Sequence, residues 1–383
     1  MLTQDENDFL TRVGPGTPAG ELLRRYWIPC AVALELTNES PTKFVRLLGE
    51  DLVLFKDKGG HTGLLGDHCP HRGASLLYGR VEERGIACAY HGWLYDTAGN
   101  CLETPAEPAD SHLYLTVKHK AYPVRKYVGL YWAYMGPLPA PEIPHYDVHS
   151  RTDGTREIYI QPMLDCNWLQ PTENSVDPVH SHFLHEDLLH LGPPTRSPEQ
   201  FTFREYEYGI MKSRLARGRR EEHPLIFPNI LRQGNGTQIR VPVDDTHTLV
   251  IRVQFTPSER ETSDPHRDDP PVFYVAPYKT PADAVYPVAR FSLTRDVQSE
   301  DHMAWESQGL IADRAHERLA STDRGIVMYR DMLQREILRV QEGADPLGVI
   351  RDPDHPIIDT NLDDTLAAGI ITRERTSVRR AEP

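Results

Sequence analysis

Two short stretches, Cys69-Pro-His-Arg-Gly73 and Cys88-Ala-Tyr-His-Gly92, decide the fold of this chain of 383 residues. The first contains Cys-x-His and the second Cys-x-x-His, and sixteen residues separate His71 from Cys88. Proline and glycine at these positions favour tight loops, in which two side chains from each stretch can point at one site. The residues that we expect to meet there are Cys69, His71, Cys88 and His91.

Each loop supplies one thiolate and one imidazole, and this mixed pairing restricts the metal group that can bind. A [2Fe–2S] cluster with two cysteines on one iron and two histidines on the other is the Rieske arrangement. Because neutral imidazoles replace anionic thiolates, such a cluster accepts an electron at a higher potential. The alternative is a closed tetrahedral zinc site. Zinc fingers, however, group cysteine with cysteine and histidine with histidine, whereas each loop here supplies one of each.

The composition limits the possible partners and locations. A net charge of −14 argues against binding to nucleic acid or to an anionic membrane surface. No run of sequence approaches the roughly eighteen apolar residues of a membrane span, and the N-terminus lacks the apolar core of a signal peptide. The other cysteines, Cys30, Cys101 and Cys166, show no paired disulfide framework, which indicates the reducing cytoplasm.

A proline-rich segment, Gly136–Pro144, divides the chain into two expected domains. Residues 1–145 contain an N-terminal helical segment followed by short strand-like runs, which predicts an all-β domain around the two loops. Its clearest strands are expected at Phe44–Leu48, Leu52–Lys56 and His61–Leu65, with a hairpin turn at Asp57–Gly60.

Residues 146–383 are predicted to form an α+β domain, with an antiparallel sheet backed by helices. A helical stretch is expected from about Ser299 to about Val340, with a break near Ser321. The strands are expected at Glu157–Gln161, Phe201–Tyr208, Ile210–Leu215, Gln238–Val243, Thr248–Thr256, Phe273–Val275 and Ala289–Thr294.

A second group of metal-binding side chains lies in Asp177-Pro-Val-His-Ser-His-Phe-Leu-His185. A mononuclear non-heme iron site needs two imidazoles and one carboxylate on one face, which leaves other positions open. His180 and His185 would point some 140° apart on an ideal helix, so both can reach one metal only if the helix breaks between them. Asp177 precedes His180 by three residues and can orient that imidazole as a hydrogen-bond acceptor. By themselves these histidines, with His182 and His190, could equally form a solvated face.

The whole pattern resembles the α subunit of Rieske non-heme iron ring-hydroxylating oxygenases. The CPHRG and YHGW boxes match that family's Rieske domain, and Asp-x-x-His-x-x-x-x-His, about ninety residues later, matches its iron-binding pattern. The match covers essentially the whole chain, although Glu173-Asn174 lies one residue nearer Asp177 than in some members. The resemblance implies that His180 and His185 bind a mononuclear Fe(II), and that His182 is a bystander.

The family takes its third iron ligand from an aspartate at the start of a late helix. Here the segment Gln298–Glu306 resembles that part of the family, so the resemblance implies Asp301 as the ligand. Asp296 and Asp313 are rivals. Glu300 and Asp301 could also merely complement the dipole of a helix at its first turn.

Three stretches, Val13–Trp27, Phe227–Arg232 and Arg240–His247, resemble the phthalate 4,5-dioxygenase branch. That branch implies an oxygenase component that uses O₂ and electrons from an NAD(P)H-dependent flavin/[2Fe–2S] reductase, with or without a ferredoxin. The implied reaction is hydroxylation of an aromatic substrate, for which an aromatic acid is our first choice. Arg214 and Arg252 could hold its carboxylate, or could be surface residues. The alternatives are O- or N-demethylation of an aryl ether or amine, and a non-catalytic Rieske electron-transfer protein.

The family also implies a head-to-tail homotrimer, or a dimer of trimers, in which electrons cross between subunits. The residue that would connect the two centres is Asp177, which could accept hydrogen bonds from its own His180 and from His91 of a neighbouring subunit. The alternative is that Asp177 only stabilises the turn before Pro178.

Overall fold

The computed structural model of the protein describes residues 2–195, 197, 200–216, 218–258, 269–279 and 296–360. The chain forms two compact units, and each is described by itself. Arg24–Pro141 form the first, here called the β unit, and Met1–Leu23 together with Glu142–Pro383 form the second, here called the mixed unit. The division lies inside the proline-rich segment that suggested a linker. None of the helices in the described ranges combines the length and the apolar character that crossing a membrane requires.

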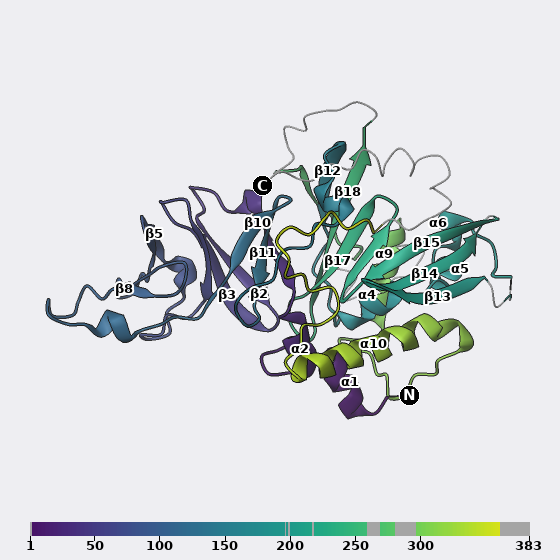
Figure 1. Ribbon diagram of the computed structural model, residues 1–383, viewed down its shortest axis with the longest axis horizontal. Helices are drawn as coiled ribbons and strands as arrows, with labels where there is room; N and C mark the ends of the chain where they lie inside the picture. The colour runs from purple at the N-terminus through teal and green to yellow at the C-terminus, as the bar shows by residue number, and fades with distance from the viewer. Residues whose placement is uncertain are drawn as a thin grey trace. The chain divides into compact units, whose positions relative to one another are not determined.

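The β unit contains three small antiparallel sheets (Figure 1). One sheet has the order β1-β11-β10, with β1 at Trp27–Val32, β10 at Val124–Tyr127 and β11 at Leu130–Tyr134. The next, β2-β3-β4-β9, spans Thr42–Leu47, Glu50–Lys56, Thr62–Gly66 and Ala121–Tyr122. The third, β5-β6-β7-β8, spans Arg80–Glu82, Gly85–Ala87, Leu94–Tyr95 and Cys101–Glu103. Short 3₁₀ turns occupy Ala33–Glu35, Leu76–Tyr78 and Leu113–Thr116.

The expected hairpin in this unit is confirmed. The N–H of Asp57 donates to the carbonyl of His61 at 2.9 Å, and Gly60 has a positive φ of 88° that suits glycine. Strands β3 and β4 then pair in register from Leu52↔Gly66 to Lys56↔Thr62. Strand β3 is buried on both faces from Leu52 to Phe55, and Val53 and Phe55 pack with Leu65 in the unit's core.

The mixed unit is built on an eight-stranded sheet with the order β13-β14-β15-β16-β17-β18-β12-β19. All neighbouring strands are antiparallel except β12 and β19. In sheet order the strands are Phe201–Tyr206, Gly209–Ala216, Arg219–Ile226, Ile230–Gln233, Gly236–Pro242, Thr248–Pro257, Gly154–Ile160 and Val272–Tyr274.

The sequence predicted six strands of this sheet, β12, β13, β14, β17, β18 and β19, and missed β15 and β16. Strand β15 reads Arg-Arg-Glu-Glu-His-Pro-Leu-Ile, which lacks apolar alternation and contains a proline. It nevertheless pairs with β14 over eight positions, because the charged half of the strand faces partners such as Arg214 rather than an apolar core. The strand expected at Ala289–Thr294 lies outside the described residues.

Helices border this sheet (Figure 1). Helix α9 begins after Asp296 and ends at Ser307, and the long α10 begins only at Arg324. The break in the expected helical stretch is therefore longer than predicted, because Gly309 with φ 91° ends the first helix and the loop from 308 to 320 supplies buried contacts. The helices are α1 Gln4–Thr11, α2 Pro18–Leu23, α3 Asp147–Ser150, α4 Leu169–Asn174, α5 His180–Phe183, α6 Glu186–Leu189, α9 Val297–Ser307 and α10 Arg324–Gln341.

The N-terminal segment differs from the expected division, which assigned it to the first domain. Residues 1–23 belong to the mixed unit, because their polar side chains bond to it. Asn7 donates to the carbonyl of Ala312 at 3.0 Å, and Asp245 accepts from the N–H of Val13 at 2.8 Å. The turn that contains Asp245, between β17 and β18, therefore also holds this segment.

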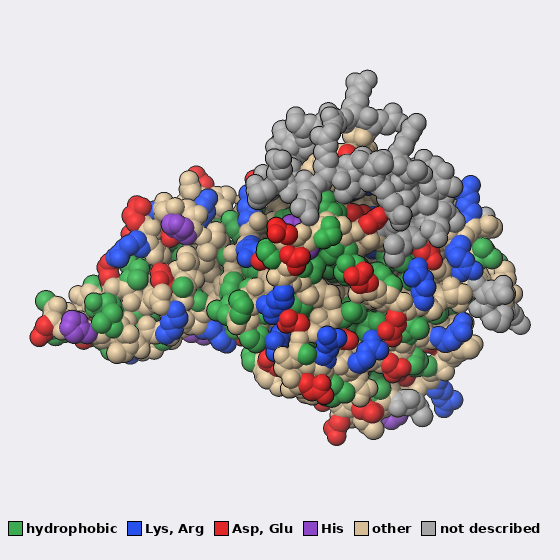
Figure 2. Space-filling model, in the orientation of Figure 1, with side chains coloured by type: hydrophobic (Ala, Val, Ile, Leu, Met, Phe, Trp, Pro, Cys, Tyr) green, Lys and Arg blue, Asp and Glu red, His purple; other side chains and the backbone are tan. Residues whose placement is uncertain are grey.

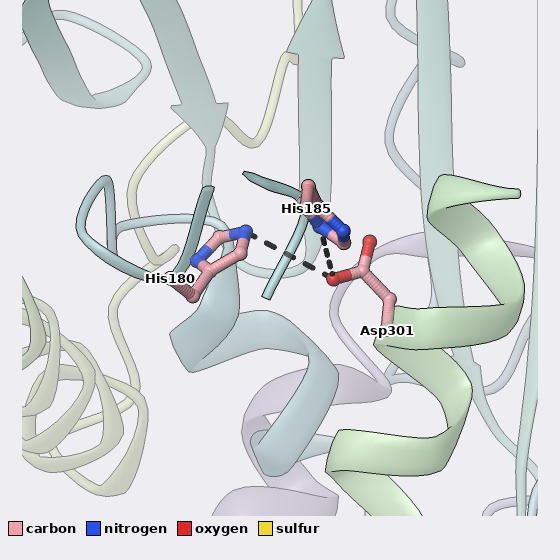
Figure 3. Close-up of side chains that lie close together, drawn as sticks. All are labelled: His180, His185 and Asp301. Carbon is pink, nitrogen blue, oxygen red and sulfur yellow. Dashed lines mark hydrogen bonds and ion pairs between the residues drawn. The ribbon is translucent and has the colours of Figure 1, made fainter. Parts of the chain in front are cut away.

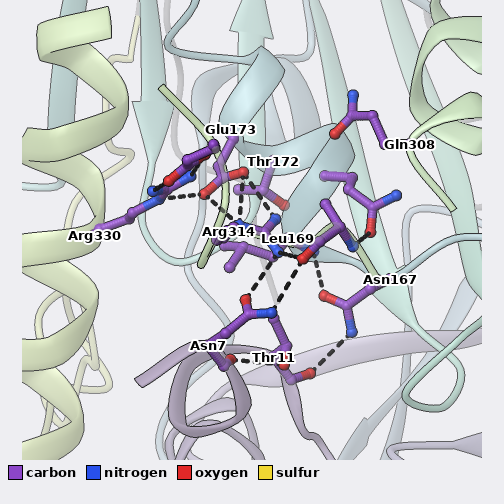
Figure 4. Close-up of polar contacts among 12 residues, drawn as sticks. Asn7, Thr11, Asn167, Leu169, Thr172, Glu173, Gln308, Arg314 and Arg330 are labelled. Atoms are coloured by element: carbon purple, nitrogen blue, oxygen red, sulfur yellow. Dashed lines mark hydrogen bonds and ion pairs between the residues drawn. The ribbon is translucent and has the colours of Figure 1, made fainter. Parts of the chain in front are cut away.

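A buried ion-pair network joins α1, α4, α10 and the loop after α9 (Figure 4). Glu173 is 7% exposed and bonds to Arg314 at 2.8 Å and to Arg330 at 2.6 Å. Arg314 also donates to Asn7 at 3.2 Å. Burial alone would raise the pKa of Glu173, but the two guanidinium groups lower it below its ordinary value. The carboxylate is therefore charged at neutral pH, and it holds α4 in position ahead of the histidine segment.

We expect Glu173→Gln to lower the free energy of unfolding of this unit by about 3 kcal/mol, because buried Arg314 would lose its counter-ion. Arg330 would keep only its pair with Glu317. Denaturant unfolding followed by circular dichroism measures the change. The control is Glu205→Gln, which breaks a pair with Arg335 whose side chains are 46% and 52% exposed. That variant should change stability by less than about 1 kcal/mol. Equal effects of the two substitutions would contradict a structural role for Glu173.

Candidate metal centres

The two cysteine–histidine loops of the β unit have the same backbone geometry. In the first, the carbonyl of Cys69 accepts from the N–H of Gly73 at 2.8 Å, and in the second, Cys88 accepts from Gly92 at 2.9 Å. In each loop the cysteine N–H also donates to the carbonyl five residues later at 2.9 Å. Gly73 and Gly92 have left-handed φ angles of 73° and 74°, which other residues rarely adopt. The second stretch thus repeats the turn of the first.

The four side chains of these loops fit the donor set of a [2Fe–2S] cluster. Cys69 and Cys88 are only 2% and 3% exposed, whereas His71 is exposed and His91 is half-buried. The two imidazole rings lie 4.5 Å apart between centroids. Burial raises the pKa of the Cys69 thiol, and the charge of Cys88 adds to the rise. Such a buried thiol becomes a thiolate ligand beside a strong positive charge, which the iron of a cluster supplies.

Aromatic side chains that the motif analysis did not single out support these ligands. The hydroxyl of Tyr95 lies 3.2 Å from Sγ of Cys69, where it can donate to a thiolate. Hydrogen bonds to cluster sulfurs are one of the factors that set the reduction potential. The ring of Trp93 stacks on His71 with centroids 4.4 Å apart and planes 3° apart, which fixes the imidazole.

The helix that carries the second group of histidines breaks between them, as their spacing required. Helix α5 ends at Phe183, and His185 has φ −106° and ψ 20°, outside the helical region. His185 then precedes α6 as its N-cap residue. The break turns the two imidazoles, which an unbroken helix would point apart, toward one side.

His180, His185 and Asp301 meet in the mixed unit (Figure 3). Nε2 of His185 lies 3.1 Å from Oδ1 of Asp301, and Nε2 of His180 lies 3.9 Å from the same oxygen. One potential ligand atom from each of the three residues lies within 4.8 Å of the others. Two imidazoles and one carboxylate in this arrangement match the donor set of a non-heme iron(II) site.

A second carboxylate holds the other nitrogen of each imidazole. Nδ1 of His180 lies 3.3 Å from Asp177, and Nδ1 of His185 lies 2.8 Å from Glu300. Burial would lower the pKa of His185, but Asp301 and Glu300 raise it above the ordinary value. The same concentration of negative charge favours a divalent cation. Carboxylates bonded to Nδ1 also fix the tautomer that offers Nε2 to a metal.

The residues that were considered as other iron ligands, Asp296, Asp313 and His182, make different contacts. Asp296 caps α9 by accepting from the N–H of Ser299 at 3.0 Å. Asp313 is exposed and bonds to His316 at 2.7 Å. Nδ1 of His182 lies 2.8 Å from the carbonyl of Gly192, and its ring packs against Phe201.

Comparison with known proteins agrees with this geometry. Residues 26–127 match the family model of the Rieske [2Fe-2S] domain. The 5,5'-dehydrodivanillate O-demethylase oxygenase subunit of Sphingobium sp. (strain NBRC 103272 / SYK-6) is 41% identical, over 92% of this chain and 84% of its own length. This chain belongs to the Rieske non-heme iron oxygenases. The phenoxybenzoate dioxygenase subunit alpha of Ectopseudomonas oleovorans is 34% identical, over 89% of this chain and 87% of its own. The phthalate 4,5-dioxygenase oxygenase subunit of Pseudomonas putida is 32% identical, over 91% of this chain and 89% of its own length.

Solved structures share the fold of this Rieske oxygenase. NdmA of Pseudomonas putida CBB5 matches with a TM-score of 0.62 and 23% identity, over 88% of this chain and 99% of its own. A chain of an oxygenase–ferredoxin complex of carbazole 1,9a-dioxygenase matches with a TM-score of 0.63 and 18% identity, over 90% of this chain and 96% of its own. The predicted fold class is confirmed, and the β unit and the mixed unit are hereafter the Rieske domain and the catalytic domain.

The chain is the oxygenase component of a multicomponent Rieske system, and its cofactors are a Rieske [2Fe–2S] cluster and a mononuclear iron. The predictions of family, enzyme class and cofactors are confirmed. The alternative of a non-catalytic electron-transfer protein is disfavoured, because the relatives that span most of the chain are oxygenase subunits.

A cavity of about 330 Å³ adjoins the three iron-site residues, and its wall on the sheet side is basic. Arg214 and Arg252 line it, together with residues that sequence reasoning missed. On the face seen in Figure 2, by contrast, acidic and basic side chains of this domain are interspersed. The missed basic residues could have been found from alternation along the strands, which puts every second residue on one face. The basic lining residues are Lys212, Arg214, His223, Arg240 and Arg252.

Proposed function

We propose that this oxygenase acts on an aromatic carboxylic acid and that its main reaction is O-demethylation of an aryl methyl ether. The proposal that the substrate is an acid rests on the excess of cationic groups in the cavity beside His180, His185 and Asp301. Arg240 is fully buried, and its hydrogen bonds from Nη1 and Nη2 go to Gln238, a neutral residue. Arg252 donates to neutral Gln254 at 2.7 Å. Buried cations need an anionic partner, and a substrate carboxylate supplies one.

The choice of demethylation rests on the relatives. The O-demethylase subunit is 41% identical to this chain, whereas the phenoxybenzoate and phthalate dioxygenase subunits are 34% and 32% identical. Those two proteins support a second candidate, dihydroxylation of an aromatic acid. In demethylation one oxygen atom of O₂ enters the methyl group, which leaves as formaldehyde. The other oxygen becomes water, with two electrons and two protons consumed.

We assign the cluster to Cys69, His71, Cys88 and His91, and the mononuclear iron to His180, His185 and Asp301. The iron, when bound, supplies the site of O₂ activation. The residues of this chain hold the substrate by its charge and keep the imidazoles oriented through Asp177 and Glu300. We infer that electrons come from an NAD(P)H-dependent flavin/[2Fe–2S] reductase, with or without a ferredoxin. A cytoplasmic location is consistent with this donor and with the free cysteines.

Replacing His180, His185 or Asp301 by alanine should remove the mononuclear iron and abolish turnover, while the cluster and its visible absorption persist. Removal of one ligand leaves too few donors for a stable site. The ratio of iron to acid-labile sulfide, measured with the absorption spectrum, separates the two centres. Asp296→Asn is the control and should keep its iron, because asparagine also caps a helix. An iron-replete, active Asp301→Ala enzyme would refute the ligand assignment.

We further propose a head-to-tail homotrimer, or a dimer of trimers, in which Asp177 carries the electron path between subunits. The side chain of Asp177 lies 3.3 Å from Nδ1 of His180 and accepts from the N–H of Val179 at 2.8 Å, so it also stabilises the turn at Pro178. It keeps 23% of its surface exposed, where a carboxylate oxygen can accept a further donor. His91, the proposed donor from the neighbouring subunit, is also accessible. A carboxylate can accept from two imidazole N–H groups at once.

Asp177→Asn should keep both metal centres and the trimer but largely lose coupled electron transfer, because an amide cannot accept both hydrogen bonds in the same way. Rapid mixing of the reduced, substrate-bound protein with O₂ measures the oxidation rate of the cluster. Asp187→Asn, on the exposed part of α6, is the matched control. An unchanged oxidation rate in Asp177→Asn, or a monomer that turns over normally, would contradict the path.

A substrate comparison tests the proposed reaction. With a flavin/[2Fe–2S] reductase and NADH, methoxybenzoates should be oxidised and should release one formaldehyde per O₂ consumed. The corresponding methoxybenzyl alcohols should react poorly, because they lack the carboxylate that the cations require. Formation of a diol without formaldehyde would favour the second candidate. Faster oxidation of the alcohols than of the acids would contradict recognition of an acid.

A further inference from the structure

The two histidines of the cluster loops pack against different kinds of neighbour. The ring of His71 stacks on Trp93 with planes 3° apart, and Trp93 is only 7% exposed. The ring of His91 lies against Tyr90 instead, with centroids 3.9 Å and planes 37° apart, and Tyr90 is 57% exposed. One face of His71 is therefore fixed by the core of the Rieske domain, whereas His91 contacts a side chain at the surface.

Arg72 extends this surface contact into a stack of three side chains. Its guanidinium carbon lies 5.5 Å from the centroid of the Tyr90 ring, on which a guanidinium makes a cation–π contact. Arg72 belongs to the first cluster loop, whereas Tyr90 and His91 belong to the second, so the stack connects the two loops. The contact with Tyr90 holds the positive charge of Arg72 at the histidine end of the loops.

The charge of Arg72 is not neutralised by a carboxylate within the described part of the chain, where its guanidinium has no ion pair. Other exposed arginines of the Rieske domain differ in this respect. Arg80 lies 2.7 Å from Glu82, and Arg46 lies 3.5 Å from Asp51. Removal of the Arg72 charge therefore changes the electrostatic potential beside His91 more than removal of a paired arginine elsewhere would.

A fixed charge at this place acts on the redox equilibrium of the cluster. Reduction adds one electron, so a nearby cation favours the reduced form and raises the reduction potential. Cys69 and Cys88 are 2% and 3% exposed, so a side chain at the surface can approach the cluster only from its histidine end. Arg72 is exposed and lies at that end.

We propose that Arg72 raises the reduction potential of the Rieske cluster and that Tyr90 is the positioning residue that holds its charge beside His91. The proposal rests on the proposed assignment of the cluster to the two loops, and it adds the residue that adjusts how readily the cluster accepts an electron. A unit charge on the order of 10 Å away, at a surface in contact with water, changes the equilibrium constant for reduction about 3-fold at low ionic strength. For one electron this is a shift of about 30 mV.

The test is a redox titration of the cluster in the intact oxygenase, followed by visible circular dichroism. Arg72→Met keeps an apolar side chain over Tyr90 but removes the charge, and it should lower the equilibrium constant for reduction about 3-fold. Arg72→Lys should retain most of the parent value, and Arg72→Glu should lower the constant about 10-fold, because it reverses the charge. These differences should shrink in about 0.5 M salt, because mobile ions screen a charge at the surface.

Substitution of Tyr90 tests whether it positions the charge. Tyr90→Phe keeps the ring and should keep the potential. Tyr90→Leu frees the guanidinium and should lower the potential by less than Arg72→Met does. The double variant Arg72→Met/Tyr90→Leu should have the potential of Arg72→Met alone, because Tyr90 acts through the charge that is already absent. Additive shifts in the double variant would overturn the positioning role of Tyr90.

The matched control is Arg46→Met on β2, at a side chain that is 47% exposed and paired with Asp51, and it should leave the potential unchanged. The electron paramagnetic resonance spectrum of the reduced cluster should show the same ligand set in every variant of Arg72 and Tyr90. An unchanged potential in Arg72→Met, a shift that does not depend on salt, or loss of the cluster from Arg72→Met and Arg72→Lys alike would overturn the role of Arg72 and leave the cluster assignment standing. A parent spectrum and potential in His91→Cys would overturn the assignment itself, and this proposal with it.

Discussion

The catalytic domain depends on bringing the Asp301 carboxylate between two imidazoles that lie far earlier in the sequence. His185 and Asp301 are 116 positions apart, yet Nε2 and Oδ1 approach to 3.1 Å. Two local features make this possible. Helix α5 stops after four residues, which frees His185 to turn, and the capped start of α9 is followed by Glu300 and Asp301, which are both buried. The Glu173 network links α4, which precedes the histidines, to the loop that follows α9.

Histidine has a different role in each of the two metal centres. In the Rieske domain the thiols are buried and the imidazoles face outward, so the histidines are the accessible end of the centre. In the catalytic domain His185 is buried, and carboxylates on its Nδ1 side hold its orientation. Histidine serves both purposes because its two nitrogens are distinct, and the partner of one sets the role of the other.

Sequence reasoning reached the parts of this protein whose chemistry is local. The cluster loops and the broken helix follow from motifs in which residue type and spacing carry the information. Asp301 was chosen over Asp296 and Asp313 only through the resemblance to the family, and the structure brings it to the two histidines. The strand β15 was missed because its charged residues satisfy long-range partners rather than an apolar period. Residues 1–23 were expected in the first domain but belong to the catalytic domain. Their attachment depends on single hydrogen bonds, such as that of Asn7 to Ala312, and no sequence pattern predicts such contacts. Lys212 was missed because a lone lysine in a strand is ordinarily solvated, and only the folded sheet reveals its burial.

The charges of the iron site and of the cavity wall balance in part. Asp301, Asp177 and Glu300 surround the imidazoles with three carboxylates, and an iron(II) ion would offset two of those charges. The third negative charge lies near the wall, because Asp301 favours the charged form of Arg240, and Asp177 and Asp301 favour that of Lys212. Arg252 donates to neutral Gln254 instead. Arg214 is neutralised by Glu221. Keeping the other cations in a buried wall costs stability unless an anion joins them, and sites that bind and orient a charged ligand accept such a cost. An anionic aromatic molecule that binds in the cavity, as we propose, would lower this cost.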